Sequence, residues 1–187
     1  MYDNEIEVKI LEIDRSDVVR RLEALGAQLV KPETRFYVFE YDFPDFRLKR
    51  NGVLCRVRSE GDNVVWCYKG KKDKDAEKQG FKKQPERQEI VSSLENTCRM
   101  LEDLGMINVA ICEKDRITYR LGGVTVDMDK LPGIREYAEV EANSESAVEQ
   151  VVKQLGYKMS QTTTKSWKEV LKHYGVNIDK VPLVVKF

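Results

Sequence analysis

The chain has 187 residues, of which 34% are charged and 41% hydrophobic, and its 32 Lys and Arg residues balance its 32 Asp and Glu residues. This length suits one domain with a sizeable core, so we expect residues 1–187 to form a single domain. The absence of net charge argues against a protein that binds nucleic acid or a membrane surface.

No apolar run approaches the ~20 residues of a membrane span, and the first residues are acidic rather than typical of a signal peptide. The chain has one histidine, and its cysteines form no Cys-x-x-Cys pair, so we do not expect a zinc site. We therefore expect a cytoplasmic protein with reduced, mostly structural thiols.

Strand composition recurs along the chain. The predicted strands cover residues 4–12, 35–42, 53–60, 63–69, 86–91, 111–121, 124–130 and 135–143. Gly61-Asp62 and Gly122-Gly123 predict tight hairpin turns, which favour antiparallel pairing. Helices are predicted to begin at Ser16, at capping boxes led by Ser92 and Ser146, and near residue 165, and to end at Gly26, Gly105, Gly156 and Gly175.

The first predicted strand alternates charged and apolar residues as Glu5-Ile6-Glu7-Val8-Lys9. Successive side chains of a strand point to opposite faces, so both glutamates and Lys9 share one face. Two carboxylates at this spacing suit a divalent metal ion, and Lys9 suits an anion bound beside it. The alternative for an isolated pair is the solvated face of an edge strand.

The same spacing of two returns in later predicted strands. It pairs Arg56 with Arg58, Lys114 with Arg116, Asp127 with Asp129, and Glu139 with Glu141, while Lys69 ends one strand and Arg87-Gln88-Glu89 begins another. One face of a whole sheet therefore carries both carboxylates and basic side chains. The opposite face is mostly apolar and would be covered by the helices.

These features predict an α+β fold, an eight-stranded antiparallel β-barrel with helices packed outside and a charged interior. An eight-stranded barrel has room for one small ligand. Buried ions cost several kcal/mol each unless they are paired or coordinated. A polyanion together with metal ions would compensate both sets of charges.

The order of these motifs resembles the CYTH superfamily, the triphosphate tunnel metalloenzymes. Glu5-x-Glu7-x-Lys9 is similar to the family's ExExK signature, and Thr164-Lys165-Ser166-Trp167 resembles its C-terminal element. Between them, Arg56-x-Arg58, Tyr68-Lys69-Gly70, Arg87-x-Glu89, Lys114-x-Arg116, Asp127 and Glu139-x-Glu141 follow in the family's order. The resemblance spans residues 5 to about 172.

The resemblance implies a role for each matching residue. Metal ligands would be Glu5, Glu7, Glu139 and Glu141, with Asp127 and Glu89 supporting a second metal ion or its waters. Phosphate binders would be Lys9, Arg56, Arg58, Lys69, Arg87, Lys114 and Arg116. Lys165 would orient a terminal phosphate or the attacking water. The implied cofactor is Mg²⁺ or Mn²⁺, as two ions.

Three functions fit this set of residues. Hydrolysis of inorganic triphosphate or of an organic one such as ATP or thiamine triphosphate requires only metal ions, phosphate clamps and a water, and we favour it. A class IV adenylyl cyclase, forming cyclic AMP and pyrophosphate, would also need a nucleoside pocket. A non-catalytic polyphosphate-binding module is disfavoured because it would not need so many carboxylates. The protein could be a monomer or a homodimer.

Residues 70–86 are rich in lysine and are expected to form a mobile loop between two strands. The loop could be merely solvated, or it could act as a lid that steers a polyanion toward the tunnel.

Overall fold

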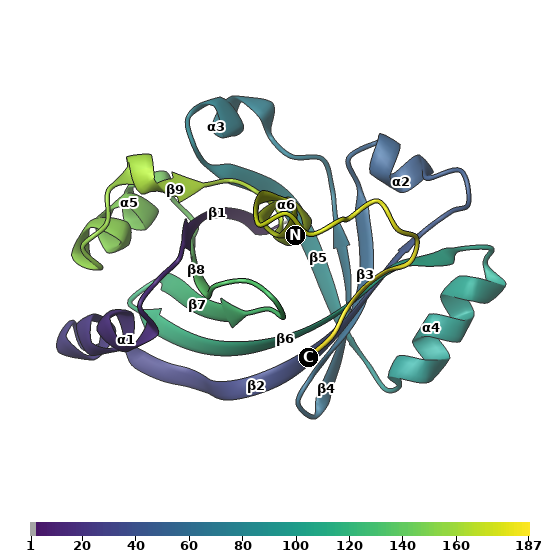
Figure 1. Ribbon diagram of the computed structural model, residues 1–187, viewed down its shortest axis with the longest axis horizontal. Helices are drawn as coiled ribbons and strands as arrows, with labels where there is room; N and C mark the ends of the chain where they lie inside the picture. Colours follow the sequence, from purple (N-terminus) through teal and green to yellow (C-terminus); the bar gives the residue numbers. More distant parts are fainter. Residues whose placement is uncertain (1–2) are drawn as a thin grey trace.

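The barrel is the central feature of the fold (Figure 1). The computed structural model describes residues 3–187, and the side chains from Ile6 onward. Within these residues, eight antiparallel strands close in the order β1–β8–β7–β6–β2–β3–β4–β5 and back to β1. They are β1 (Asp3–Leu11), β2 (Gln28–Asp42), β3 (Leu54–Glu60), β4 (Asn63–Lys69), β5 (Lys82–Val91), β6 (Ile107–Leu121), β7 (Val124–Lys130) and β8 (Tyr137–Ala142). The predicted α+β fold with an eight-stranded antiparallel barrel is confirmed.

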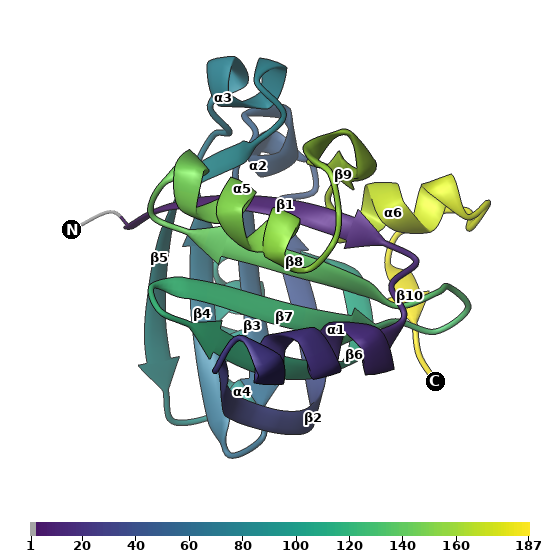
Figure 2. The same cartoon turned by 90° about the vertical axis from the view of Figure 1, so that its left-hand side faces the viewer.

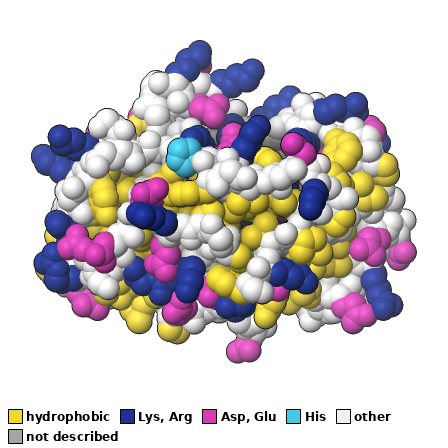
Figure 3. All heavy atoms as spheres, in the orientation of Figure 1, with side chains coloured by type: hydrophobic (Ala, Val, Ile, Leu, Met, Phe, Trp, Pro, Cys, Tyr) yellow, Lys and Arg dark blue, Asp and Glu magenta, His cyan; other side chains and the backbone are white. Residues whose placement is uncertain are grey.

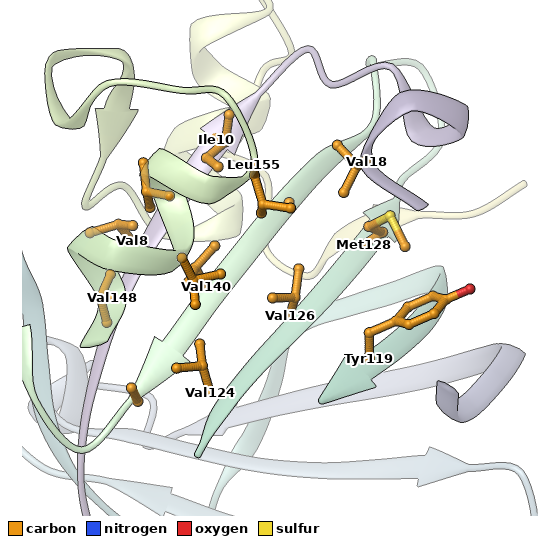
Figure 4. Packing of buried hydrophobic residues seen from close by; sticks show 14 of the residues in the cluster. Val8, Ile10, Val18, Tyr119, Val124, Val126, Met128, Val140, Val148 and Leu155 are labelled. Atoms are coloured by element: carbon orange, nitrogen blue, oxygen red, sulfur yellow. The ribbon is translucent and has the colours of Figure 1, made fainter. Parts of the chain in front are cut away.

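The strand pleat separates an apolar outer face from a charged inner face. In β1, Val8 and Ile10 lie in the hydrophobic core outside the barrel, whereas Glu7 and Lys9 line the interior. Figure 4 shows the same outward packing for Val126 of β7. Because side chains alternate along a strand, one register places Glu7 and Lys9 of β1 and Asp127 of β7 in the interior.

Three helices cover parts of the outer face. α1 (Arg15–Ala24) and α5 (Glu145–Gln154) lie against the side formed by β1, β8, β7 and β6 (Figure 2). α4 (Leu94–Asp103) packs Leu101 against Tyr41 and Val57 on another side. Burial of such apolar side chains, at about 25 cal/mol per Å² of area removed from water, is the main stabilising contribution of these helices.

Three of the predicted helix starts are displaced by one or two residues. The Asp14 carboxylate, rather than Ser16, caps α1 and accepts the N–H of Asp17. The Ser93 hydroxyl, rather than that of Ser92, accepts the N–H of Asn96 at the start of α4. The Ser144 hydroxyl, rather than that of Ser146, accepts the N–H of Ala147 at the start of α5. At the starts of α4 and α5, two nearby serines offer the same cap chemistry. The serine with an extended backbone is the cap, Ser93 for α4 and Ser144 for α5.

The prediction that residues 70–86 form a loop is wrong. The segment contains α3 (Lys74–Lys78) and the first half of β5. Its ends are tied together, since the N–H of Gly70 donates to the Pro85 carbonyl at 2.8 Å and the N–H of Asp73 donates to the Lys83 carbonyl at 2.8 Å. A Cβ at Gly70 would lie 2.8 Å from the Pro85 ring, so this close approach requires glycine.

The remaining short elements lie between the barrel strands or follow the last of them. α2 (Arg47–Arg50) connects β2 to β3, and η1 (Met159–Gln161) leads into β9 (Thr162–Thr163), which pairs with β1. α6 (Trp167–His173) packs Val170 and Leu171 against Phe36 and Tyr137 of the barrel. β10 (Leu183–Val185) then pairs in parallel with β6. Within residues 3–187, no helix has both the length and the apolar composition needed to cross a membrane.

Candidate active site in the barrel interior

The barrel encloses a cavity of about 660 Å³. All eight barrel strands contribute to its lining, together with α2, the start of α6 and residues 178–183. Basic residues in the lining include Lys9, Arg56, Arg58, Lys69, Lys82, Lys114 and Arg116. Acidic residues in the lining include Glu7, Glu40, Glu86, Asp127, Glu139 and Glu141. The interior of the barrel therefore holds both kinds of charge.

Lys9 lies between two carboxylates in the cavity. Its Nζ is 2.7 Å from Glu7 Oε1 and 2.8 Å from Glu139 Oε1. Lys82 Nζ is also 2.8 Å from Glu7 Oε1. Burial alone would raise the pKa of Glu7, but Lys9 and Lys82 hold it below its ordinary value. Burial would also raise the pKa of Glu139, but Lys9 and Arg116 hold it well below its ordinary value.

Arg116 is the centre of a second network. Its guanidinium pairs with Asp127, with Asp129 at 2.5 Å, and with Glu139 at 2.5 Å. Lys114 Nζ lies 2.7 Å from the same Asp129. Burial would lower the pKa of Arg116, but Asp127 and Asp129 raise it well above its ordinary value. Asp129 is fully buried and does not line the cavity, so it positions the two basic side chains from behind.

A third network connects β3, β4 and β5. Glu86 pairs with Lys69 and, at 3.5 Å, with Arg56, and it accepts a hydrogen bond from the Cys67 thiol at 2.7 Å. Arg58 pairs with Glu60 and donates to Gln88 Oε1 at 3.0 Å. Among the described residues, the buried Nε of Arg56 has no hydrogen-bond partner. That nitrogen is a donor available to a ligand.

The structure brings most of the predicted site residues into this one cavity. Those that line it are Glu7, Lys9, Arg56, Arg58, Lys69, Lys114, Arg116, Asp127, Glu139 and Glu141. The backbone of Glu5 pairs with Gln84 in the barrel, but the side chain of Glu5 lies outside the described part of the structure.

Arg87 and Glu89 do not lie in the cavity, which corrects the sequence-based assignment. In β5 the residues that line the cavity are Lys82, Gln84, Glu86 and Gln88. Arg87 and Glu89 are exposed on the outer face, opposite Tyr68 and Trp66 of β4. The strand begins at Lys82 rather than at residue 86, and its even-numbered residues point inward, whereas the prediction places residues 87 and 89 inside. Residues 82–89 are polar at both parities except for Pro85, so no local alternation marks which set points inward.

Lys165 also lies outside the cavity lining. Its backbone N–H donates to Thr163 Oγ1 at 3.3 Å, between β9 and α6. The basic residue of this element that lines the cavity is Lys168, whose Nζ is 2.5 Å from Glu40 Oε2. The indole N–H of Trp167 donates to Glu40 Oε1 at 2.8 Å. Glu40 thus anchors the start of α6. The lysine that reaches the cavity, Lys168, lies three residues after the predicted Lys165.

Glu7 and Glu141 form one close pair of carboxylates in the cavity, as Asp127 and Glu139 do. Glu7 and Glu141 are direct cross-strand partners on β1 and β8, and side chains so placed lie within about 5.5 Å at Cβ. Burial, and next the charge of Glu7, raise the pKa of Glu141 to about 7. A cation between them would relieve this repulsion, and carboxylate oxygens are suitable ligands for Mg²⁺ or Mn²⁺.

Among residues whose side chains are described, no three acidic, histidine or cysteine side chains converge closely enough to form a complete metal site. The carboxylates of Glu7 and Glu139 are instead held by Lys9 and its neighbours. Binding a metal ion here would require these ion pairs to rearrange, with the basic side chains turning to another anion. A phosphate in the cavity would be such an anion.

A closed antiparallel barrel with acidic and basic side chains inside defines a charged β-tunnel protein. A model of the CYTH domain matches residues 3–168, and the chain belongs to this family. The family of triphosphate tunnel proteins predicted from the order of the motifs is therefore confirmed. No curated protein sequence matches the chain.

Solved structures share the fold at low sequence identity. A candidate adenylate cyclase from Vibrio parahaemolyticus is 17% identical with a TM-score of 0.78, over 92% of this chain and 99% of that one. The PH1012 protein of Pyrococcus horikoshii is 22% identical with a TM-score of 0.72, over 87% and 96%. HpAC1 of Hippeastrum, a candidate adenylyl cyclase with a dominant triphosphatase activity, is 14% identical with a TM-score of 0.61, over 94% and 99%.

Proposed function

We propose that this protein is a metal-dependent triphosphatase that binds its substrate inside the barrel. Water attacks the terminal phosphorus, the bond from that phosphorus to the bridging oxygen breaks, and orthophosphate and a diphosphate leave. One observation carries the proposal: the carboxylates and the basic side chains line the same cavity. A pure anion-binding module would gain nothing from carboxylates that oppose its ligand.

The basic side chains of the lining would bind the phosphates. They are Lys9, Arg56, Arg58, Lys69, Lys82, Lys114 and Arg116. The guanidinium groups of the arginines match the oxygens of a phosphate group in pairs. The unpartnered Nε of Arg56 supports this role, since a buried donor without an acceptor costs about 1–3 kcal/mol until a ligand accepts its proton.

Glu7 and Glu141 would hold a divalent cation, with Glu139 and Asp127 beside them and Glu5 two residues earlier on the same strand. A bound Mg²⁺ or Mn²⁺ polarises phosphate oxygens and lowers the pKa of a coordinated water. Two such ions are proposed. The Asp127 carboxylate, fixed by Thr118 at 2.6 Å and by Arg116, would orient water next to the terminal phosphate. Glu89 and Lys165 are given no role, because neither lines the cavity.

Product analysis tests the proposal. The protein is incubated with inorganic triphosphate, ATP or thiamine triphosphate, in Mg²⁺, in Mn²⁺ and in a chelator. We expect metal-dependent release of orthophosphate and no cyclic AMP. Cyclic AMP with an equal amount of pyrophosphate would instead establish the adenylyl cyclase reaction, and binding without any product would indicate a polyphosphate-binding module.

A matched pair of variants tests the metal ligands. Glu141→Gln removes a charge in the cavity and should lower kcat by at least about a hundredfold, the scale expected when a group needed in the transition state is lost. Glu149→Gln makes the same change on the exposed surface of α5 and should leave kcat unchanged. Full activity of Glu141→Gln would remove Glu141 from the proposed metal site.

A further inference from the structure

One carboxylate beside the cavity has no part in the proposed function. Glu60 is the last residue of β3, and it does not line the cavity. Acidic and basic side chains lie next to one another in several places on the surface shown in Figure 3, and such exposed pairs contribute little free energy. Glu60 differs from them, because its side chain is only 11% exposed and pairs with Arg58, which lines the cavity.

The guanidinium of Arg58 is held along one edge by two strands. Glu60 and Arg58 share one face of β3, since they are two residues apart on a strand. The Nε of Arg58 donates to Glu60 Oε1, and its Nη2 donates to Gln88 Oε1 of β5 at 3.0 Å. Both contacts are on the Nε–Nη2 edge, so they fix the plane of the guanidinium and leave Nη1 to bind a phosphate oxygen in the cavity.

Glu60 is itself held in place from β2. Its Oε2 is 2.7 Å from Lys31 Nζ, and that Nζ lies 5.1 Å from the centroid of the Phe36 ring. Phe36 is buried and is the cross-strand partner of Glu60. The register of β2 against β6 shifts on both sides of Lys31, and irregularities of this kind re-aim a side chain. The Glu60 carboxylate is thus fixed by two cations from different strands.

The charges around Arg58 make its alignment depend on Glu60. Burial would raise the pKa of Glu60, but Arg58 and Lys31 lower it to about 2, so the carboxylate is ionised at neutral pH. Burial and next the like charge of Arg56 lower the pKa of Arg58. Glu60 supplies a counter-charge that offsets this repulsion. An arginine side chain also carries about 2 kcal/mol of rotamer entropy, so it keeps one orientation only where contacts hold it.

We propose that Glu60 is a positioning residue that aligns Arg58 with a phosphate group of the substrate. Glu60 does not touch the substrate, and it acts through its hydrogen bond to the Nε of Arg58. This inference rests on the proposed function, because Arg58 is one of the proposed phosphate binders. A carboxylate, which by its own charge repels phosphate, thereby makes phosphate binding tighter.

A double-mutant cycle tests the inference, with titration calorimetry of inorganic triphosphate in Mg²⁺. Glu60→Gln should weaken binding about tenfold, which is about 1.4 kcal/mol. Loss of a negative charge would by Coulomb attraction alone strengthen the binding of a polyanion, so a weaker affinity has the sign that positioning requires. Arg58→Gln should weaken binding at least as much. In the Arg58→Gln background, Glu60→Gln should weaken it no further, because the residue through which Glu60 acts is gone.

Glu113→Gln is the matched control. The Glu113 side chain is 16% exposed, pairs with Arg35 at 3.6 Å and does not line the cavity. This variant should change the affinity by less than about twofold.

Glu60→Asp separates position from charge. The aspartate keeps the negative charge, but its side chain is one methylene shorter, so binding should still weaken. Circular dichroism of each variant checks that it is folded. Glu60→Asp keeps a carboxylate for Lys31 and remains informative if Glu60→Gln does not fold.

The outcomes separate this inference from the proposed function. If Glu60→Gln causes the same loss of affinity in both backgrounds, Glu60 acts on the fold rather than through Arg58, and the inference is overturned. Unchanged or tighter binding in Glu60→Gln would overturn it as well. Product analysis of the same proteins reports on the function: wild-type protein that binds triphosphate and releases no orthophosphate would contradict the triphosphatase, while the cycle would still decide the role of Glu60. Wild-type protein that does not bind triphosphate would contradict both.

Discussion

Lys82 and Glu7 form an ion pair across the junction of β5 and β1, with Lys82 Nζ 2.8 Å from Glu7 Oε1. The pair closes the ring of charges at the seam where the first strand of the chain meets the fifth. Lys82 is largely shielded from solvent there, and this desolvation lowers its pKa below the ordinary value for lysine in spite of Glu7. The next residue, Lys83, lies on the opposite face of the strand and does not line the cavity.

Substitution of these two neighbouring lysines tests the role of Lys82. Lys82→Met should weaken triphosphate binding about tenfold to a hundredfold, the range expected for one lost charge-assisted hydrogen bond of about 1.5–3 kcal/mol. Lys83→Met removes the same charge from the other face and should change the affinity by less than about threefold. The measurement is KM with the best substrate. Equal losses of affinity in the two variants would indicate only a general electrostatic effect of losing one positive charge.

A second pair of variants tests the inward parity of the barrel. Arg58→Gln should lower kcat/KM by at least about tenfold, because Arg58 lines the cavity. Arg87→Gln should change kcat/KM by less than about threefold, because Arg87 is exposed outside the barrel. Steady-state kinetics of both purified variants under one set of conditions would decide, and a larger loss for Arg87→Gln would contradict the register of β5.

Tyr137→Phe should stabilise the ligand-free protein. The Tyr137 hydroxyl is buried and has no hydrogen-bond partner among the described residues. An unpaired buried hydroxyl costs about 1–3 kcal/mol, so its removal should raise the free energy of unfolding by about 1 kcal/mol. Urea denaturation measures the change, with Tyr119→Phe in the outer core as the comparison. A loss of stability in Tyr137→Phe would show that the hydroxyl has a partner.

The cysteines should differ in reactivity. Cys55, Cys67 and Cys112 are buried, and burial raises the pKa of the Cys112 thiol to about 12, whereas Cys98 is partly exposed. Because a reagent must reach the thiol and the thiolate is the reactive form, the Cys98 thiol should react first with an aromatic disulfide reagent. Cys98→Ser should remove that first phase. Persistence of the phase in the variant would mean that one of the barrel cysteines is accessible.

The inner face could be predicted because strand alternation is a local property. Spacing alone placed Arg56 with Arg58 and Glu139 with Glu141 on common faces, and the structure has both pairs in the cavity. The prediction failed at β5, where Pro85 and the run of lysines give residues 82–86 little strand propensity. Residues 82–86 form a strand because they pair with β1, while the rest of β5 pairs with β4, and no local pattern expresses either pairing.

Partner choice inside the barrel could not be predicted either. Glu86 meets Lys69 and Arg56 because three strands lie in one register, and the sequence does not state that register. Likewise, α2 has four residues and depends on the Asp42 carboxylate, which accepts its backbone N–H groups. Elements this short are stabilised by tertiary contacts rather than by propensity.

The parallel pairing of β10 with β6 has a consequence for solubility. β6 is longer than β7, and β10 occupies Ala110, Ile111 and Cys112 of β6, ahead of the first residue that β7 pairs, Asp115. Without β10 these backbone N–H and C=O groups would form an open strand edge, which another chain could extend by adding a strand. By pairing with β6, β10 thus covers this strand edge and hinders association of the protein with other chains through it.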